Sequence, residues 1–124
     1  MKHRKLGRTG IQVSEVGLGT WQLGSADWGQ VSEHDAVAIL QRAADSGVNF
    51  LDTADVYGGG VSERIIGKFL KQTDHTIHVA TKCGRKLWVD LGLQWPERIT
   101  LEMARQATEQ SLQNLGVDSL VLQQ

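Results

Sequence analysis

The feature that most constrains this chain is a repeated pattern in which a short β-prone run ends on an ionisable side chain. The first run, residues 48–51, closes at Asp52, and the second, residues 77–82, closes at Lys82. Helix-like spacing of apolar residues begins between them, just past Ser62. Strand, loop, helix and strand in this order predict two neighbouring parallel strands. The carboxyl ends of parallel strands meet at one sheet edge about 4.8 Å apart, so we expect Asp52 and Lys82 within salt-bridge reach.

The loop between the first of these strands and the helix, residues 53–61, is long for such a link, which indicates that it carries function. It contains Tyr57, the only tyrosine. An ammonium group stabilises a neighbouring phenolate, so Tyr57 is a candidate general acid if the loop folds back over Lys82. Asp52 would keep the lysine charged and oriented. Glycines 58–60 lack the spacing of a phosphate-binding motif and are interpreted as turning residues.

Cap residues and apolar spacing predict three helices that separate the strands. Ser32, Ser62 and Thr100 are the expected N-caps. The expected helices span residues 32–47, 62–72 and 100–116.

Three further segments complete the strand pattern. Residues 4–14 alternate polar and apolar side chains around a glycine-rich turn and predict a β-hairpin. Val16 and Leu18 predict a first buried strand, which places Trp21 at its carboxyl end, either in the core or at a pocket rim. Residues 119–122 predict another strand. The expected fold is therefore α/β, with three βα units and the start of a fourth strand.

Composition excludes several classes of protein. The 124 residues suit one soluble domain, with 40% hydrophobic and 22% charged residues, and the apolar runs fall short of the ~18 residues of a membrane span. The basic amino end lacks the hydrophobic core of a secretory signal, so the expected location is cytoplasmic. A net charge of −1 gives no footprint for nucleic acid.

The cysteine and two of the histidines are further candidates for reactive or metal-binding residues. The single cysteine, Cys83, rules out an internal disulfide; it is either a reactive thiolate beside Lys82 or a small packing residue. His75 and His78 fall on opposite faces of an expected strand with no acidic or cysteine cluster nearby, so no metal site is expected.

Three motifs together resemble the aldo-keto reductase family: LGTW at residues 18–21, FLDTADVYGGGVSE at 50–63 and VATKCG at 79–84. The resemblance covers essentially the whole chain. It implies a (β/α)8 TIM barrel, of which this chain supplies an amino-terminal β-hairpin and the first three to four βα units. The barrel is then incomplete, because a whole one needs about 250 residues. The expected domain is a partial barrel over 1–124, truncated before the fifth strand.

The resemblance also implies roles for individual residues. The family's catalytic tetrad is Asp, Tyr, Lys and His, and its first three members match Asp52, Tyr57 and Lys82. Its histidine is expected two residues beyond Gln124 and has no match. Residues Gly19, Thr20, Trp21 and Asp52 are implied to lie near the nicotinamide of the cofactor. The side chains implied to contact the substrate are Trp21, Tyr57 and Trp88.

The activity implied for the complete protein is NADPH-dependent reduction of an aldehyde or ketone to an alcohol, with the tyrosine as proton donor. The isolated chain is expected to be inactive. The alternative is a non-enzymatic fragment, or a binding or accessory protein of the same family. An open parallel sheet exposes its last strand, so the fragment is expected to self-associate or to pair with a complementary half-barrel.

Overall fold

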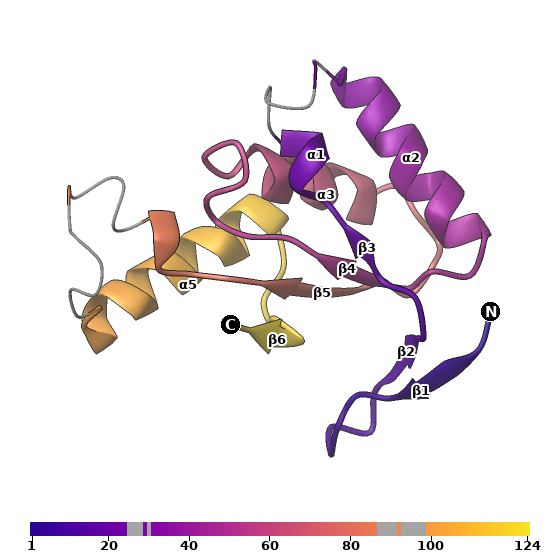
Figure 1. Cartoon of the computed structure of the whole chain (residues 1–124), viewed down its shortest axis with the longest axis horizontal. Coiled ribbons are helices and arrows are strands. Elements are labelled where there is room, and N and C mark those ends of the chain that lie inside the picture. The colour runs from indigo at the N-terminus through magenta and orange to yellow at the C-terminus, as the bar shows by residue number, and fades with distance from the viewer. Residues whose placement is uncertain (25–28, 30, 87–91, 93–98) are drawn as a thin grey trace.

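A hairpin and a four-stranded parallel sheet form the framework of the computed structural model, which describes residues 1–24, 29, 31–86, 92 and 99–124 (Figure 1). The hairpin pairs β1 and β2 antiparallel, and the sheet has the order β3-β4-β5-β6 with every pairing parallel. The predicted α/β fold with an amino-terminal hairpin is thus confirmed. The strands are β1 (His3–Lys5), β2 (Gln12–Ser14), β3 (Leu18–Gly19), β4 (Phe50–Asp52), β5 (His78–Thr81) and β6 (Leu122–Gln123).

The three predicted helices are present, and two of the three predicted N-caps are confirmed. Ser32 caps its helix by accepting a hydrogen bond from the backbone N–H of Asp35, and Thr100 accepts one from that of Met103. Gly116, with φ of 65°, ends the last helix as predicted. A further short helix follows β3 directly and carries Trp21. The helices are α1 (Trp21–Gly24), α2 (Glu33–Asp45), α3 (Val61–Leu70) and α5 (Leu101–Leu115).

The N-cap predicted at Ser62 is wrong. The cap residue of α3 is Gly60, in the left-handed region at φ 89°, with no side-chain cap hydrogen bond. Ser62 lies inside the first turn of α3 and is fully buried. Its hydroxyl is therefore turned into the protein instead of closing the helix end.

Two strand predictions also need correction. Val16 is 59% exposed and lies outside β3, because the hydroxyl of Ser14 donates to its carbonyl and turns the chain there. The last strand begins at Leu122 instead of residue 119, since its register on β5 pairs Leu122 with Ala80.

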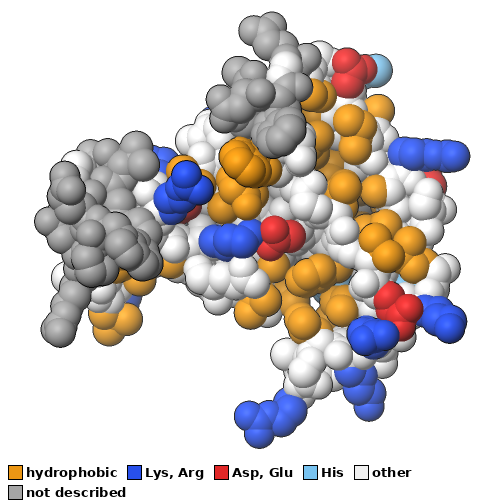
Figure 2. Space-filling view, in the orientation of Figure 1, with side chains coloured by type: hydrophobic (Ala, Val, Ile, Leu, Met, Phe, Trp, Pro, Cys, Tyr) orange, Lys and Arg blue, Asp and Glu red, His pale blue; other side chains and the backbone are white. Residues whose placement is uncertain are grey.

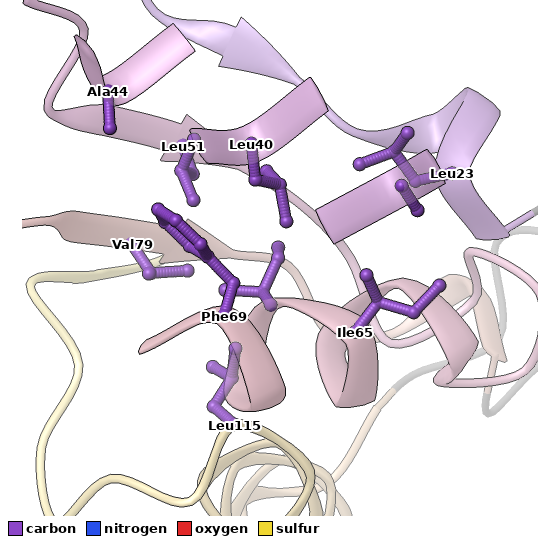
Figure 3. Close-up of a cluster of buried hydrophobic side chains, with 10 residues drawn as sticks. Leu23, Leu40, Ala44, Leu51, Ile65, Phe69, Val79 and Leu115 are labelled. Carbon is purple, nitrogen blue, oxygen red and sulfur yellow. The ribbon is translucent and has the colours of Figure 1, made fainter. Parts of the chain in front are cut away.

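The core lies between the sheet and the helices that cover it. Figure 3 shows Phe69 directed from α3 toward the strand residues Leu51 and Val79, with Leu40 of α2 beside Leu51. Phe69 and Leu40 are fully buried, and each contributes about 1.5 to 3 kcal/mol by leaving water. Gly67 lets α5 approach α3, because a Cβ there would lie 2.6 Å from the carbonyl oxygen of Asn114. The helices thereby fix the sheet whose carboxyl edge carries the candidate site. No helix within the described ranges is long and apolar enough to cross a membrane.

Candidate active site

An ion pair joins the ends of two neighbouring strands, as predicted. Asp52 is the last residue of β4, and Lys82 follows β5 directly. Lys82 Nζ donates to both carboxylate oxygens of Asp52, at 2.7 and 2.8 Å, and to the carbonyl oxygen of Thr53 at 2.9 Å. These three acceptors use all three ammonium protons. The lysine is therefore fixed in one orientation, although its side chain is 34% exposed and that of Asp52 39%.

Tyr57 folds back over this ion pair. Its ring centroid lies 5.4 Å from Lys82 Nζ, within the range of a cation–π contact. The ring of Trp21 stacks on it with the centroids 6.0 Å apart and the planes at 18°. The sequence left Trp21 either in the core or at a pocket rim. Because Trp21 is 43% exposed, it lies at the rim of the site. Aspartate, lysine, tyrosine and tryptophan thus meet at one sheet edge.

A backbone-to-backbone contact holds the tyrosine loop against α1. A Cβ on Gly24 would lie 2.7 Å from the carbonyl oxygen of Tyr57, and one on Gly58 only 1.8 Å from the carbonyl oxygen of Gly24. Gly58 also has φ of 62°, a conformation that L side chains rarely adopt. These two glycines therefore do more than turn the chain. They permit the close approach that stacks Trp21 on Tyr57.

The remaining residues implied to bind cofactor lie at the same edge. Gly19 ends β3, and no atom lies within 4 Å of where its Cβ would be, so the space beside it is open. Thr20 is fully buried, and both its backbone N–H and its hydroxyl donate to the carbonyl oxygen of Asp52, each at 3.0 Å. Trp88, implied to contact substrate, lies outside the described residues, so its contacts remain a prediction.

Sequence reasoning missed two buried carboxyl groups behind the site. Glu63 is fully buried and accepts hydrogen bonds from the hydroxyl of Thr81 at 2.7 Å and the amide of Asn114 at 2.8 Å. Asp55 is 6% exposed, and its Oδ2 has no hydrogen-bond partner in the described part of the chain. Burial, followed by the charge of Glu63, raises the pKa of Asp55 to about 6. The one sequence feature that could have pointed to them is their position, since Asp55 lies in the loop and Glu63 in the helix that follow β4.

Asp55→Asn should stabilise the protein at neutral pH. Because the folded-state pKa of Asp55, about 6, is above its ordinary value of 3.8, the folded state loses stability as pH rises through this window. We expect the variant to be more stable by about 1 to 3 kcal/mol at pH 7.5, with the gain vanishing below about pH 4. Urea unfolding at several pH values measures this difference.

The exposed carboxyl of Asp74 provides the control, since Asp74→Asn should change stability by no more than about 0.5 kcal/mol. A gain from Asp55→Asn that is the same at pH 4 and pH 7.5 would contradict the pKa assignment.

Cys83 lies beside the site as a packed thiol. Burial, and then the charge of Asp55, raises the pKa of its thiol, which disfavours the reactive thiolate. The packing interpretation of Cys83 is therefore the better supported one. In the described ranges no three His, Cys, Asp or Glu side chains gather where they could hold a metal ion.

A parallel sheet covered by helices, with its ionisable residues at the strand carboxyl ends, is the arrangement of barrel enzymes of the (β/α)8 type. The model of the aldo/keto reductase family matches residues 15–124. The chain belongs to this family of oxidoreductases.

Individual relatives agree with this assignment. The chain is 42% identical over 121 residues to L-galactose dehydrogenase of Arabidopsis thaliana, covering 93% of this chain and 34% of that protein. The aldo-keto reductase AKR11C1 from Bacillus halodurans, solved in its holo form, is 31% identical with a TM-score of 0.78, covering 99% of this chain and 39% of that one. An aldo/keto reductase from Klebsiella pneumoniae, solved in complex with NADP and acetate, is 25% identical with a TM-score of 0.70, covering 92% and 35%. The chain thus spans little more than a third of the length of these relatives.

Proposed function

We propose that the complete protein containing this chain is an NADPH-dependent oxidoreductase that reduces an aldehyde or ketone to an alcohol. Tyr57 is the proton donor. Lys82 stabilises the phenolate that Tyr57 becomes after it gives up its proton, and Asp52 orients Lys82. Within that protein, residues 1–124 form the amino-terminal part of the barrel domain, up to the strand before the fifth. The observation that carries the proposal is the geometry of Lys82, whose ammonium is held by three acceptors and lies 5.4 Å from the centre of the Tyr57 ring.

The chemistry asked of these side chains is proton transfer. When bound, NADPH supplies the hydride that forms the new C–H bond at the carbonyl carbon. The electron pair of the C=O bond moves to the oxygen, which takes the proton of the Tyr57 hydroxyl and becomes the alcohol. The tyrosine is left as a phenolate, next to the fixed positive charge of Lys82, and regains a proton from water. A preorganised charge of this kind stabilises the transition state without rearranging during the reaction.

The open space at this edge fits one end of a nicotinamide cofactor. Gly19 leaves room beside the end of β3, where any side chain would occupy that space. The stacked rings of Trp21 and Tyr57 form an aromatic wall next to it. Gly19, Trp21 and Asp52 would line this part of the cofactor, and the fully buried Thr20 would support them from beneath. The NADP complex of the relative from Klebsiella pneumoniae supports the choice of cofactor. The rings of Trp21 and Tyr57 would form an apolar wall against the substrate. We propose that Trp88 also contacts the substrate.

Purified full-length protein should bind NADPH saturably and oxidise it when an aldehyde or ketone is added. Cofactor fluorescence measures the binding, and the fall in NADPH absorbance with a panel of carbonyl compounds measures turnover. Saturable binding without turnover of any carbonyl would favour the alternative of a binding or accessory protein of the same family.

The isolated 124-residue chain provides the comparison for this experiment. We propose that it is inactive alone, and that the open edge of β6 pairs with the remaining barrel strands or with a second copy. In Figure 2 hydrophobic side chains are spread over the middle of the visible face, while several Lys and Arg side chains lie at its periphery. Saturable micromolar NADPH binding by the isolated chain, or a sharp monomer peak in light scattering, would contradict this part of the proposal.

A further inference from the structure

Three hydroxyl side chains form a fully buried cluster directly beneath the candidate site. Thr20 follows β3, Thr53 follows β4 and Ser62 lies in the first turn of α3, and each is 0% exposed. The hydroxyl of Thr53 donates to Ser62 Oγ at 3.0 Å. Ser62 Oγ lies 2.9 Å from Thr20 Oγ1 and 3.0 Å from the Thr20 carbonyl oxygen, and its one proton serves these acceptors. The hydroxyl of Thr20 donates in turn to the carbonyl oxygen of Asp52 at 3.0 Å.

The cluster runs in one direction, from Thr53 through Ser62 and Thr20 to the backbone of Asp52. Both ends of this series are residues that hold Lys82, Thr53 through its carbonyl oxygen and Asp52 through its carboxylate. A buried hydroxyl that loses its partner is costly, so a complete series of this kind favours one arrangement of the strand ends. Ser62 is its central member, since it is the only one that contacts both threonines.

Ser62 also contacts the segment that carries Tyr57. Its backbone N–H donates to the carbonyl oxygen of Tyr57 at 3.3 Å. Its Cβ lies 3.0 Å from where a Cβ on Gly24 would be, so Ser62 packs at the contact between α1 and the tyrosine loop. One buried side chain thus lies where the end of β3, the end of β4 and the Tyr57 loop meet.

We propose that Ser62 is a positioning residue, which holds the supports of Lys82 and the loop of Tyr57 in register through this hydroxyl cluster. The inference rests on the proposed function, because positioning matters for turnover only if Tyr57 donates the proton. It also explains why the serine does not cap α3: its hydroxyl is used in the cluster, and the cap position falls to Gly60.

The test compares Ser62→Ala with Ser111→Ala in the full-length protein. Ser111 is also fully buried in a helix, but its hydroxyl has no hydrogen-bond partner in the described part of the chain. We expect Ser62→Ala to lower kcat about tenfold or more while KM and the NADPH Kd change less than about threefold, since the group acts on the reacting geometry. Ser111→Ala should leave all three constants within about twofold.

A purely structural role predicts a different result. Gly67→Ala places a Cβ 2.6 Å from the Asn114 carbonyl oxygen, where α3 packs against α5, and serves as a control that lowers Tm. It should retain kcat per folded molecule within about twofold, whereas Ser62→Ala should not. If Ser62→Ala yields no soluble protein, Thr53→Val carries the same test, because it removes the hydroxyl that donates to Ser62 at nearly constant shape.

Crystal structures of the serine variants give a readout independent of activity. The Lys82 to Tyr57 arrangement should shift by about 1 Å or more in Ser62→Ala and stay unchanged in Ser111→Ala. A Ser62→Ala protein with unchanged kcat and unchanged geometry, beside a Tyr57→Phe variant that loses turnover, overturns the positioning role and leaves the proposed function intact. If Tyr57→Phe keeps its activity, the proposed function fails, and the crystal structures alone decide whether Ser62 positions these groups.

Discussion

Tyr57→Phe should lower the kcat of the full-length protein by about 10² to 10⁴, the usual contribution of a positioned general acid. Phenylalanine keeps the ring that stacks on Trp21 and lies near Lys82, and removes only the hydroxyl. Because the lost interaction is made in the transition state, the NADPH Kd should stay near that of the unsubstituted protein. Steady-state kinetics with a carbonyl substrate and a fluorescence titration with NADPH measure the two quantities.

Trp21→Phe is the matched control for this prediction. It also retains an aromatic ring at the stacked pair but takes away no hydroxyl. It should therefore act mainly on KM. If Tyr57→Phe retains kcat within about twofold, Tyr57 is not the proton donor and the complete protein is better sought among binding proteins of the family.

Lys82→Met should produce the second large loss, a fall in kcat of about 10² or more. The substitution removes the positive charge beside the Tyr57 ring and leaves the carboxylate of Asp52 without its partner. A preorganised charge that stabilises a developing anion typically contributes this much to the rate. Kinetics at saturating substrate and cofactor measure the loss.

Two comparisons make the result specific. Lys68 forms an exposed ion pair with Glu33 on the surface, and Lys68→Met should leave kcat within about twofold. The double variant Asp52→Asn, Lys82→Met should be no worse than Lys82→Met alone, because Asp52 acts through the lysine and the two losses are not additive. A double variant whose loss is the product of the two single losses would show that Asp52 acts independently of Lys82.

The pairing of Asp52 with Lys82 was predictable because it depends on two local patterns and one geometric rule. Each strand is marked by its own β-prone run, and parallel pairing brings the strand ends to a common edge. The length of the loop indicated a functional segment, but only the structure decided that Tyr57 folds back over the pair. The N-caps Ser32 and Thr100 were equally predictable, since capping is a local hydrogen bond to the third residue along the chain.

Ser62 shows where local reasoning fails. A serine before an acidic residue and an apolar helical run favours an N-cap, yet the Ser62 hydroxyl bonds to Thr53, nine residues away, and to Thr20, 42 residues away. Tertiary hydrogen bonds inside the protein outweighed the local cap. Gly58 was interpreted only as a turning residue, because its contact with Gly24, a distant part of the chain, cannot be read from the turn itself.

The sequence by itself determined the order of strands and helices and the identity of the ionisable residues at the strand ends, because periodicity and chain direction are local properties. Only the tertiary structure decided which polar side chains are buried away from solvent. It buried Glu63 and Asp55 behind the site, raised the pKa of Asp55 to about 6, and drew Ser62 into the cluster beneath Lys82. Burial is set by what packs on top of a residue, and here those packing partners come from parts of the chain up to 51 residues away, as with Asn114 on Glu63.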